Sequence, residues 1–306
     1  MKRQILDVAK WAWVVIVVVV AGFYFYRNYQ EISDYLATIS ISHLVASFCL
    51  LMVGKLALSE MTRYSLKKIN VNLNYSDALT ITSVTQLGKY LPGGIWHIAG
   101  KLGIYKARQI SLKKATQAII FENVWLLSSA FVIGVLLLMV SSRDVLCTLN
   151  QYFCDVNIQL LITIILPVLW VGGLFIFEKL FFKGSEVIIK DFAIKFFVMI
   201  AIWLSFGFSF WLIFPQIGTN FLVPITGAFS LSWVIGYVAI FAPGGIGVRE
   251  YLITILLASF FSGQEVAIYA IMHRLIWVLE EIFLGAGTAL VFGVPISANE
   301  NSETNQ

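Results

Sequence analysis

The stretch YVAIFAPGGIGVREYLITILL (residues 237–257) decides the fold, because a Pro-Gly-Gly-Ile-Gly run and an Arg-Glu pair interrupt an otherwise apolar segment. A second stretch, QLGKYLPGGIWHIAGKL (residues 86–102), is interrupted in the same way. Proline removes a backbone donor and glycine allows sharp turns, so each stretch is predicted to be two short helices joined at a break. The residues at the two breaks are Pro92, Gly93 and Gly94, then Pro243, Gly244, Gly245 and Gly247.

The composition is that of an integral membrane protein. Of the 306 residues, 59% are hydrophobic and 12% are charged, and the mean hydropathy is +0.86. Soluble domains carry about 25% charged residues. The length leaves no room for a separate soluble catalytic domain, and we expect the tail 297–306 to be disordered.

The hydropathy pattern predicts an all-α polytopic membrane protein. An apolar helix needs about 20 residues to cross the bilayer. The limbs of 76–110 and 222–262 are shorter or more polar, and we predict that both regions are re-entrant hairpins buried among the other helices. The six predicted spans are 11–26, 41–61, 116–140, 157–178, 192–214 and 266–292.

The basic residues predict the orientation in the cell inner membrane. Most of the 21 lysines and arginines fall in loops on one side, and the positive-inside rule makes that side, with both termini, cytoplasmic. The net charge of +4 therefore reflects topology, and no nucleic-acid partner is predicted. Cys147 and Cys154 share the external loop 141–156, where a disulfide can form in an oxidising compartment.

The two breaks also predict an internal repeat. Pro92 and Pro243 are 151 residues apart, and at this offset the spans of the two halves align. The halves are 1–150 and 151–296, each with three crossings and one hairpin. An odd number of crossings inverts the second half, as in many secondary transporters. The alternative is a duplication retained only for stability.

Several charged residues are predicted at membrane depth, where each costs about 2.5–3.5 kcal/mol on insertion scales. A group of this size implies a polar cavity or a mutual network. The alternative is that salt bridges only hold the helices together, which we favour for Glu280 and Glu281, whereas we favour function for Arg249 and Arg274. The group is Lys55, Lys89, His97, Glu122, Arg249, Glu250, His273, Arg274, Glu280 and Glu281.

The breaks are suited to bind an anion. The second limb of each hairpin begins there, and a helix N-terminus carries free N–H groups and a positive dipole end. Lys89 and Lys101 flank the first break and Arg249 follows the second. The alternative is two tight turns in which Arg249 and Glu250 neutralise each other.

We predict that an anionic headgroup binds between the halves. Glu250 and Glu122 would hold the cations of the empty site or carry a coupling proton, and aromatic side chains such as Trp96, Trp125 and Trp277 would line the path. No metal or cofactor is predicted. The predicted substrate-binding residues are Lys89, Pro92, Gly93, Gly94, His97, Lys101, Glu122, Pro243, Gly244, Gly245, Gly247, Arg249, Glu250, His273, Arg274 and Trp277.

The segments LGKYLPGGIWHIAGKLGIYKA (87–107) and APGGIGVREYLITILL (242–257) resemble the lysylphosphatidylglycerol synthase transmembrane-region family of flippase-like membrane proteins. The resemblance covers roughly residues 10–292. In two-domain members it implies that the membrane part moves an aminoacylated phospholipid between leaflets, while a soluble domain makes that lipid. We expect a stand-alone member without that domain, for which the resemblance implies a polyprenyl-linked or other glycolipid cargo.

We therefore predict a transporter of an anionic lipid in envelope biogenesis. The sequence has no GxxxxGK[ST] phosphate-binding loop, so ATP-driven pumping by this chain is not expected. One alternative is a scaffold for envelope-biosynthesis enzymes such as a glycosyltransferase complex. Another is an intramembrane lipid-modifying transferase, against which the sequence lacks HExxH, GxSxG and a His/Cys metal motif. We expect no enzymatic activity.

Overall fold

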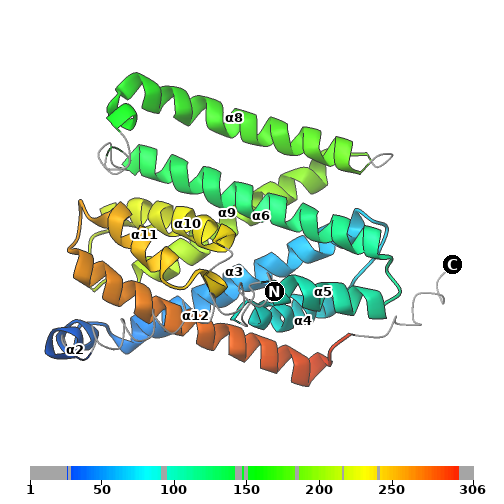
Figure 1. Ribbon diagram of the computed structural model, residues 1–306, viewed down its shortest axis with the longest axis horizontal. Helices are drawn as coiled ribbons and strands as arrows, with labels where there is room; N and C mark the ends of the chain where they lie inside the picture. The colour runs from blue at the N-terminus through cyan, green and yellow to red at the C-terminus, as the bar shows by residue number, and fades with distance from the viewer. Residues whose placement is uncertain are drawn as a thin grey trace, which may run out of the picture.

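The computed structural model describes residues 26, 29–90, 95–141, 147, 151–182, 186–215, 217–239 and 242–295. Within these ranges every element is a helix (Figure 1), which confirms the predicted all-α class. The predicted span 11–26 (except Tyr26), the break Pro92–Gly94 and the tail 297–306 lie outside the described residues. The α-helices are α2 (Tyr29–Ala37), α3 (Ile41–Lys67), α4 (Tyr75–Gln86), α5 (Trp96–Ala107), α6 (Leu112–Ser141), α8 (Val156–Phe181), α9 (Ile189–Trp211), α10 (Leu222–Val238), α11 (Val248–Leu257) and α12 (Gly263–Phe292).

Six described helical segments are long and apolar enough to cross a membrane, so the protein is a multi-pass membrane protein. Five of them are the predicted spans, now seen as α3, α6, α8, α9 and α12. The sixth, Thr219–Val238, is the first limb of the second predicted hairpin, 222–262. The re-entrant placement of both hairpins stays a prediction.

Several helices begin where the sequence supplies a side-chain acceptor for the free N–H groups of the first turn. Such caps stabilise a helix by about 0.5–2 kcal/mol. In α4, for example, Asn74 Oδ1 accepts from the Asp77 N–H at 2.8 Å. The caps of this kind are Ser40 for α3, Asn74 for α4, Asp155 for α8 and Ser262 for α12.

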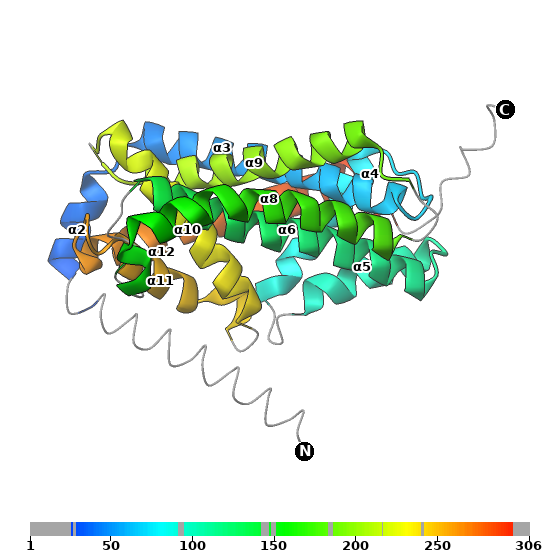
Figure 2. The same cartoon turned by 90° about the horizontal axis from the view of Figure 1, so that it is seen from above.

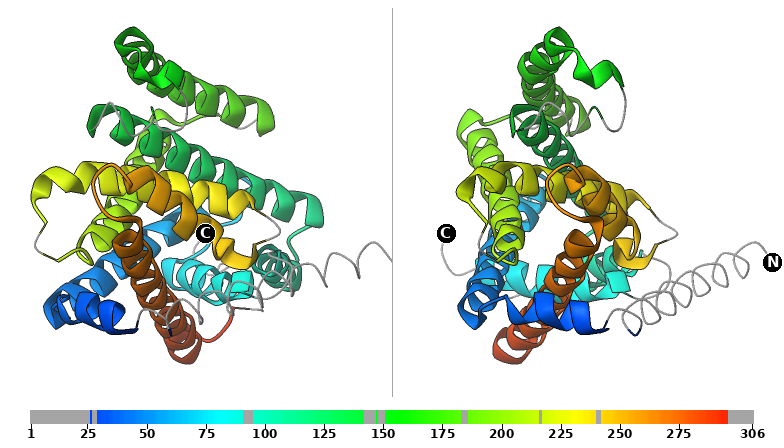
Figure 3. Two further views of the ribbon diagram at one scale, coloured as in Figure 1. Left: turned by 60° about the vertical axis from the view of Figure 1, so that its left-hand side comes forward. Right: turned by 90° about the vertical axis from the view of Figure 1, so that its left-hand side faces the viewer.

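The helices pack so that each half completes the other. α6 packs against α10, α12 packs against α4, and α3 packs against α9. The first two pairs approach closely at glycines: a Cβ at Gly134 would lie 2.8 Å from Leu231 N, and one at Gly285 would lie 3.3 Å from the Ser83 carbonyl oxygen. α8 forms an outer layer beside α6 (Figures 1 and 3).

The helix bounds recur along the chain. α12 begins and ends 151 residues after α6, and α11 lies close to the same offset from α5. The helix contacts follow the same correspondence. α6 packs against α10, and its counterpart α12 packs against α4, the counterpart of α10. An internal repeat produces such a correspondence. The domain boundary and the inversion across the membrane stay predictions.

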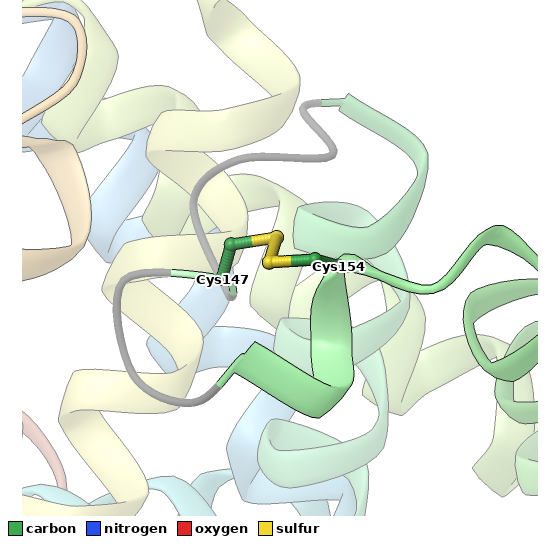
Figure 4. The surroundings of a disulfide bond; sticks show 2 residues. All are labelled: Cys147 and Cys154. Carbon is green, nitrogen blue, oxygen red and sulfur yellow. A yellow bond between two sulfur atoms is a disulfide. The ribbon is translucent and has the colours of Figure 1, made fainter.

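The two ends of the molecule differ in chemistry. At one end Lys67 pairs with Asp191 at 2.8 Å and Arg108 pairs with Asp77 at 3.1 Å. α6 begins near this end and, with 30 residues, extends for about 45 Å. Beyond its far end, Cys147 and Cys154 form a disulfide (Figure 4). The disulfide and the basic end therefore lie at opposite ends of α6.

Candidate functional site

The described residues just before the first break meet the second break inside the molecule. The short helices at the breaks, η1 (Leu87–Tyr90) and η4 (Pro243–Gly245), are in contact, and in Figure 2 the two hairpins approach this point from opposite ends. Gly244 and Gly245 have φ values of 59° and 73°, in the left-handed region that glycine adopts without strain. The Arg274 guanidinium donates to the Gly244 carbonyl at 2.5 Å, which anchors the second break.

A cavity of about 280 Å³ opens beside the breaks. Three of its lining side chains are basic or can become so: Lys89, His97 and Arg249. The other lining residues are Gln86, Ile95, Ile98, Leu127, Trp233, Gly236, Tyr237, Val238, Ala239, Ala242, Gly244 and Gly245. The cavity thus contains residues from both hairpins.

Arg249 is the cationic side chain of this cavity that no carboxylate neutralises directly. It is 6% exposed, and the described residues offer it neither a hydrogen bond nor an ion pair. Its guanidinium lies 5.2 Å from the Phe229 ring and 5.3 Å from the Trp277 ring. Cation–π contacts hold the charge in place and leave its N–H groups free to bind an anion.

Arg249 and Glu250 do not neutralise each other, contrary to the alternative considered from the sequence. The Glu250 carboxylate accepts from the Gly247 N–H at 2.8 Å and lies 3.7 Å from Arg274. Glu250 therefore caps α11 and holds Arg274. The stem of Arg249 packs over Gly236, where an added Cβ would lie 2.2 Å from Arg249 Cγ, and Arg249, Glu250 and Arg274 line a small pocket together.

Glu281 is the ion-pair partner of two lysines beside the cavity. Its carboxylate pairs with Lys55 and, at 2.5 Å, with Lys89. It also accepts from the Tyr90 hydroxyl at 2.7 Å and the Trp277 indole at 2.8 Å. Glu281, rather than the predicted Glu250 or Glu122, is the counter-charge of Lys89. The pair joins α12 and α3 to the first break.

His97 belongs to a hydrogen-bonded chain across the two halves. Its Nε2 lies 3.0 Å from the Tyr237 hydroxyl, which donates to Asn123 Oδ1 at 2.5 Å. The two rings also make an edge contact at 5.7 Å. His97 is thereby fixed at the mouth of the cavity, at the N-terminus of α5, where no side chain caps the first turn.

An apolar groove continues from the cavity between α5 and α6. It has a volume of about 360 Å³ and shares Ile98, Leu127 and Tyr237 with the cavity. Its remaining lining residues are Leu102, Thr116, Ile119, Ile120, Asn123 and Val124. A basic cavity that opens into an apolar groove matches a ligand with an anionic head and a hydrocarbon chain.

Some predicted site residues lie elsewhere. Lys101 and Glu122 pair with each other at 2.6 Å, buried with Thr62 in a separate network. His273 hydrogen-bonds to Ser209 at 2.9 Å among aromatic rings. Trp125 donates to Glu178.

The lining therefore includes Lys89, His97, Gly244, Gly245 and Arg249 from the predicted set. Gly247, Glu250, Arg274 and Trp277 lie next to the lining, through the contacts given above. The side chain of Pro243 is not among those described.

Polar residues of the site that were not in the predicted binding set include Lys55, Glu281, Tyr90 and Tyr237. Lys55 and Glu281 could have been found from the sequence, because they are charged residues within apolar spans. The tyrosines carried no such signal, because only the packing shows which tyrosine hydroxyl is hydrogen-bonded.

Comparison with models of known protein families gives a match to one family. The sequence model of the family described as "Lysylphosphatidylglycerol synthase TM region" matches residues 11–280. A search of curated proteins gives no match.

Proposed function

Because the chain belongs to the family of lysylphosphatidylglycerol synthase TM regions, we propose that it moves an anionic phospholipid or a polyprenyl-linked lipid between leaflets in envelope biogenesis. The headgroup binds in the cavity at the two breaks. The hydrocarbon chain lies in the groove between α5 and α6. Movement of a bound lipid requires no chemical step, and the proposed role is transport rather than catalysis.

The observation that carries this proposal is the buried guanidinium of Arg249 in the cavity wall. A buried charge without a partner is costly, and an anionic ligand provides the missing partner. Lys89, which also lines the cavity, and the N-terminus of α5 add positive potential there. The apolar groove selects an anion that carries a hydrocarbon chain over a soluble one.

The proposed setting is the cell inner membrane with both termini in the cytoplasm. What supports it is the separation of the basic end of the molecule from the disulfide, since disulfides persist in oxidising compartments and basic loops stay cytoplasmic. In this orientation the basic end faces enzymes that make envelope lipids, which are the proposed partners.

The test is a leaflet-exchange assay in proteoliposomes that carry fluorescent phosphatidylglycerol, lysyl-phosphatidylglycerol or a polyprenyl phosphate. We expect the wild type to speed exchange of at least one of these lipids. Arg249→Gln should slow that exchange by about 10²-fold, because a charge-assisted contact contributes about 1.5–3 kcal/mol. The matched control is Arg63→Gln, at a side chain 41% exposed near the basic end, and it should keep the wild-type rate. Equal rates for protein-free and wild-type vesicles with all three lipids would contradict the proposal.

A further inference from the structure

Glu280 is a buried acidic residue that has no hydrogen-bonded partner. Its exposure is 0%, and neither carboxylate oxygen accepts a hydrogen bond from the part of the chain that the structure describes. The next residue, Glu281, accepts from four side chains. Burial without partners disfavours the ionised form of a carboxyl group. Glu280 is therefore suited to exchange a proton.

The charges that act on Glu280 are those of the lysine cluster. Lys55 reaches it from α3, Lys89 from η1, and Glu281 lies beside it on α12. The other elements packed against α12 add little. On α4, Asp77 pairs with Arg108; on α11, Glu250 holds Arg274 while Arg249 faces the cavity; α2 and α9 meet α12 through the aromatic rings of Tyr35, Phe206 and Phe210.

In the cluster of Lys55, Lys89 and Glu281, the positive charges outnumber the negative ones. Two lysines share one carboxylate, Glu281, so one positive charge remains. An ionised Glu280 balances it. An anion in the cavity beside Lys89 balances it equally well, and the ionised Glu280 is then a surplus negative charge in a site of low dielectric constant.

We propose that Glu280 is a proton-binding site coupled to the anion site. It is ionised while the cavity is empty, and it takes up one proton from water when an anionic headgroup binds beside Lys89 and Arg249. Release of the headgroup returns the proton. This inference rests on the proposed function, and it makes headgroup binding and proton binding mutually reinforcing, because coupling between two sites is reciprocal.

The test is calorimetric titration of the full chain in detergent with short-chain phosphatidylglycerol, in two buffers that differ in heat of ionisation. The phosphodiester of this probe stays anionic across the neutral range, so any proton taken up binds to the protein. We expect uptake of about one proton per lipid and an affinity that falls by up to about tenfold per pH unit as the pH rises. Glu280→Gln should bind the lipid with no proton uptake and no pH dependence.

The matched control is Glu265→Gln, the same change in the first turn of α12, which should behave as the wild type. Proton uptake that persists in Glu280→Gln would overturn the inference and assign the proton to another group, such as His97. If Glu280→Gln unfolds, infrared difference spectra of the wild type serve instead: a carboxylic acid band must grow when the lipid is added. Absence of lipid binding by the wild type at every pH would overturn the proposed anion site as well.

Discussion

At the scale of single residues, Glu281 determines how η1, the short helix before the first break, is held. It contacts Lys55, Lys89, Tyr90 and Trp277, which come from α3, η1 and its own helix. Lys55 also lies 4.6 Å from the Trp277 ring. Because Lys55 and Trp277 are buried and Lys89 and Tyr90 are partly buried, these groups rely on the carboxylate as an electrostatic partner.

Glu281→Gln should therefore destabilise the protein strongly. Removing one partner of a buried pair typically costs about 3–5 kcal/mol, since the remaining charge stays buried. Denaturant unfolding followed by tryptophan fluorescence measures the loss. Glu60→Gln is the control: Glu60 pairs with Arg63 but is 31% exposed, and its loss should stay below about 1 kcal/mol. Equal losses in the two variants would show that Glu281 is not a structural hub.

The sequence indicated some of these residues and not others. Arg249, Lys89 and the glycines could be predicted because charges and backbone breaks are rare in apolar helices. The partners could not. A charge within an apolar helix shows that a partner is needed, but not which other helix supplies it. Glu250 and Glu122 were predicted to hold the cations of the site together, whereas Glu250 lies beside Arg274 and Glu122 pairs with Lys101 in a separate network.

At the scale of elements, the second hairpin depends on left-handed backbone conformations that only glycine adopts without strain. Gly245 combines a φ of 73° with a close neighbour: an added Cβ would lie 2.9 Å from the Gly236 carbonyl oxygen. That contact keeps α10 and α11 near each other at the break. The same approach lets Arg249 pass over Gly236 toward the cavity.

Gly245→Ala should open this turn. A non-glycine residue in the left-handed region costs of order 1–3 kcal/mol, and the clash with Gly236 adds to it. We expect lower stability in denaturant unfolding and weaker binding of phosphatidylglycerol. The control is Gly173→Ala in α8, where nothing lies within 4 Å of an added Cβ. It should be neutral or stabilise by up to about 1 kcal/mol. A stabilised Gly245→Ala would contradict the role of the turn.

Hydropathy predicted the long spans well, because five continuous apolar segments leave few alternatives. It placed α10 in the second hairpin, and the 17 residues of α10 together with the preceding turn make a segment of 20 residues that is also long enough to cross a membrane. The polar helix α2 (Tyr29–Ala37) was not predicted, since nine residues with little hydrophobicity resemble a loop.

At the scale of the whole molecule, the polarity of the ends defines how the protein sits in the membrane. The disulfide lies beyond the end of α6, whereas Lys67, Lys68 and Lys195 gather with Glu178 and Asp191 at the other end. The apolar face of α8 is largely exposed. It matches the lipid hydrocarbon that would surround it.

Thiol labelling of intact cells tests this orientation, with the protein in a Cys49→Ser background. An impermeant maleimide should label Cys154 only after reduction, because the disulfide protects it beforehand. A cysteine introduced as Lys190→Cys, at an exposed position of the basic end, should be labelled only after the cells are opened. The reverse pattern would place the basic end outside and contradict the proposed orientation.

The Glu281 cluster has a consequence for biogenesis. Lys55 and Lys89 are synthesised early, but their carboxylate partner lies 226 and 192 residues further along the chain. During synthesis the first half thus enters the membrane with two lysines that have no acidic partner until α12 emerges. Until then the lysines of the nascent first hairpin must remain hydrated, and the insertion of α12 supplies the carboxylate that neutralises them. Ribosome stalling or truncation before Glu281 should leave a chain that quality-control proteases can recognise by its unpaired lysines.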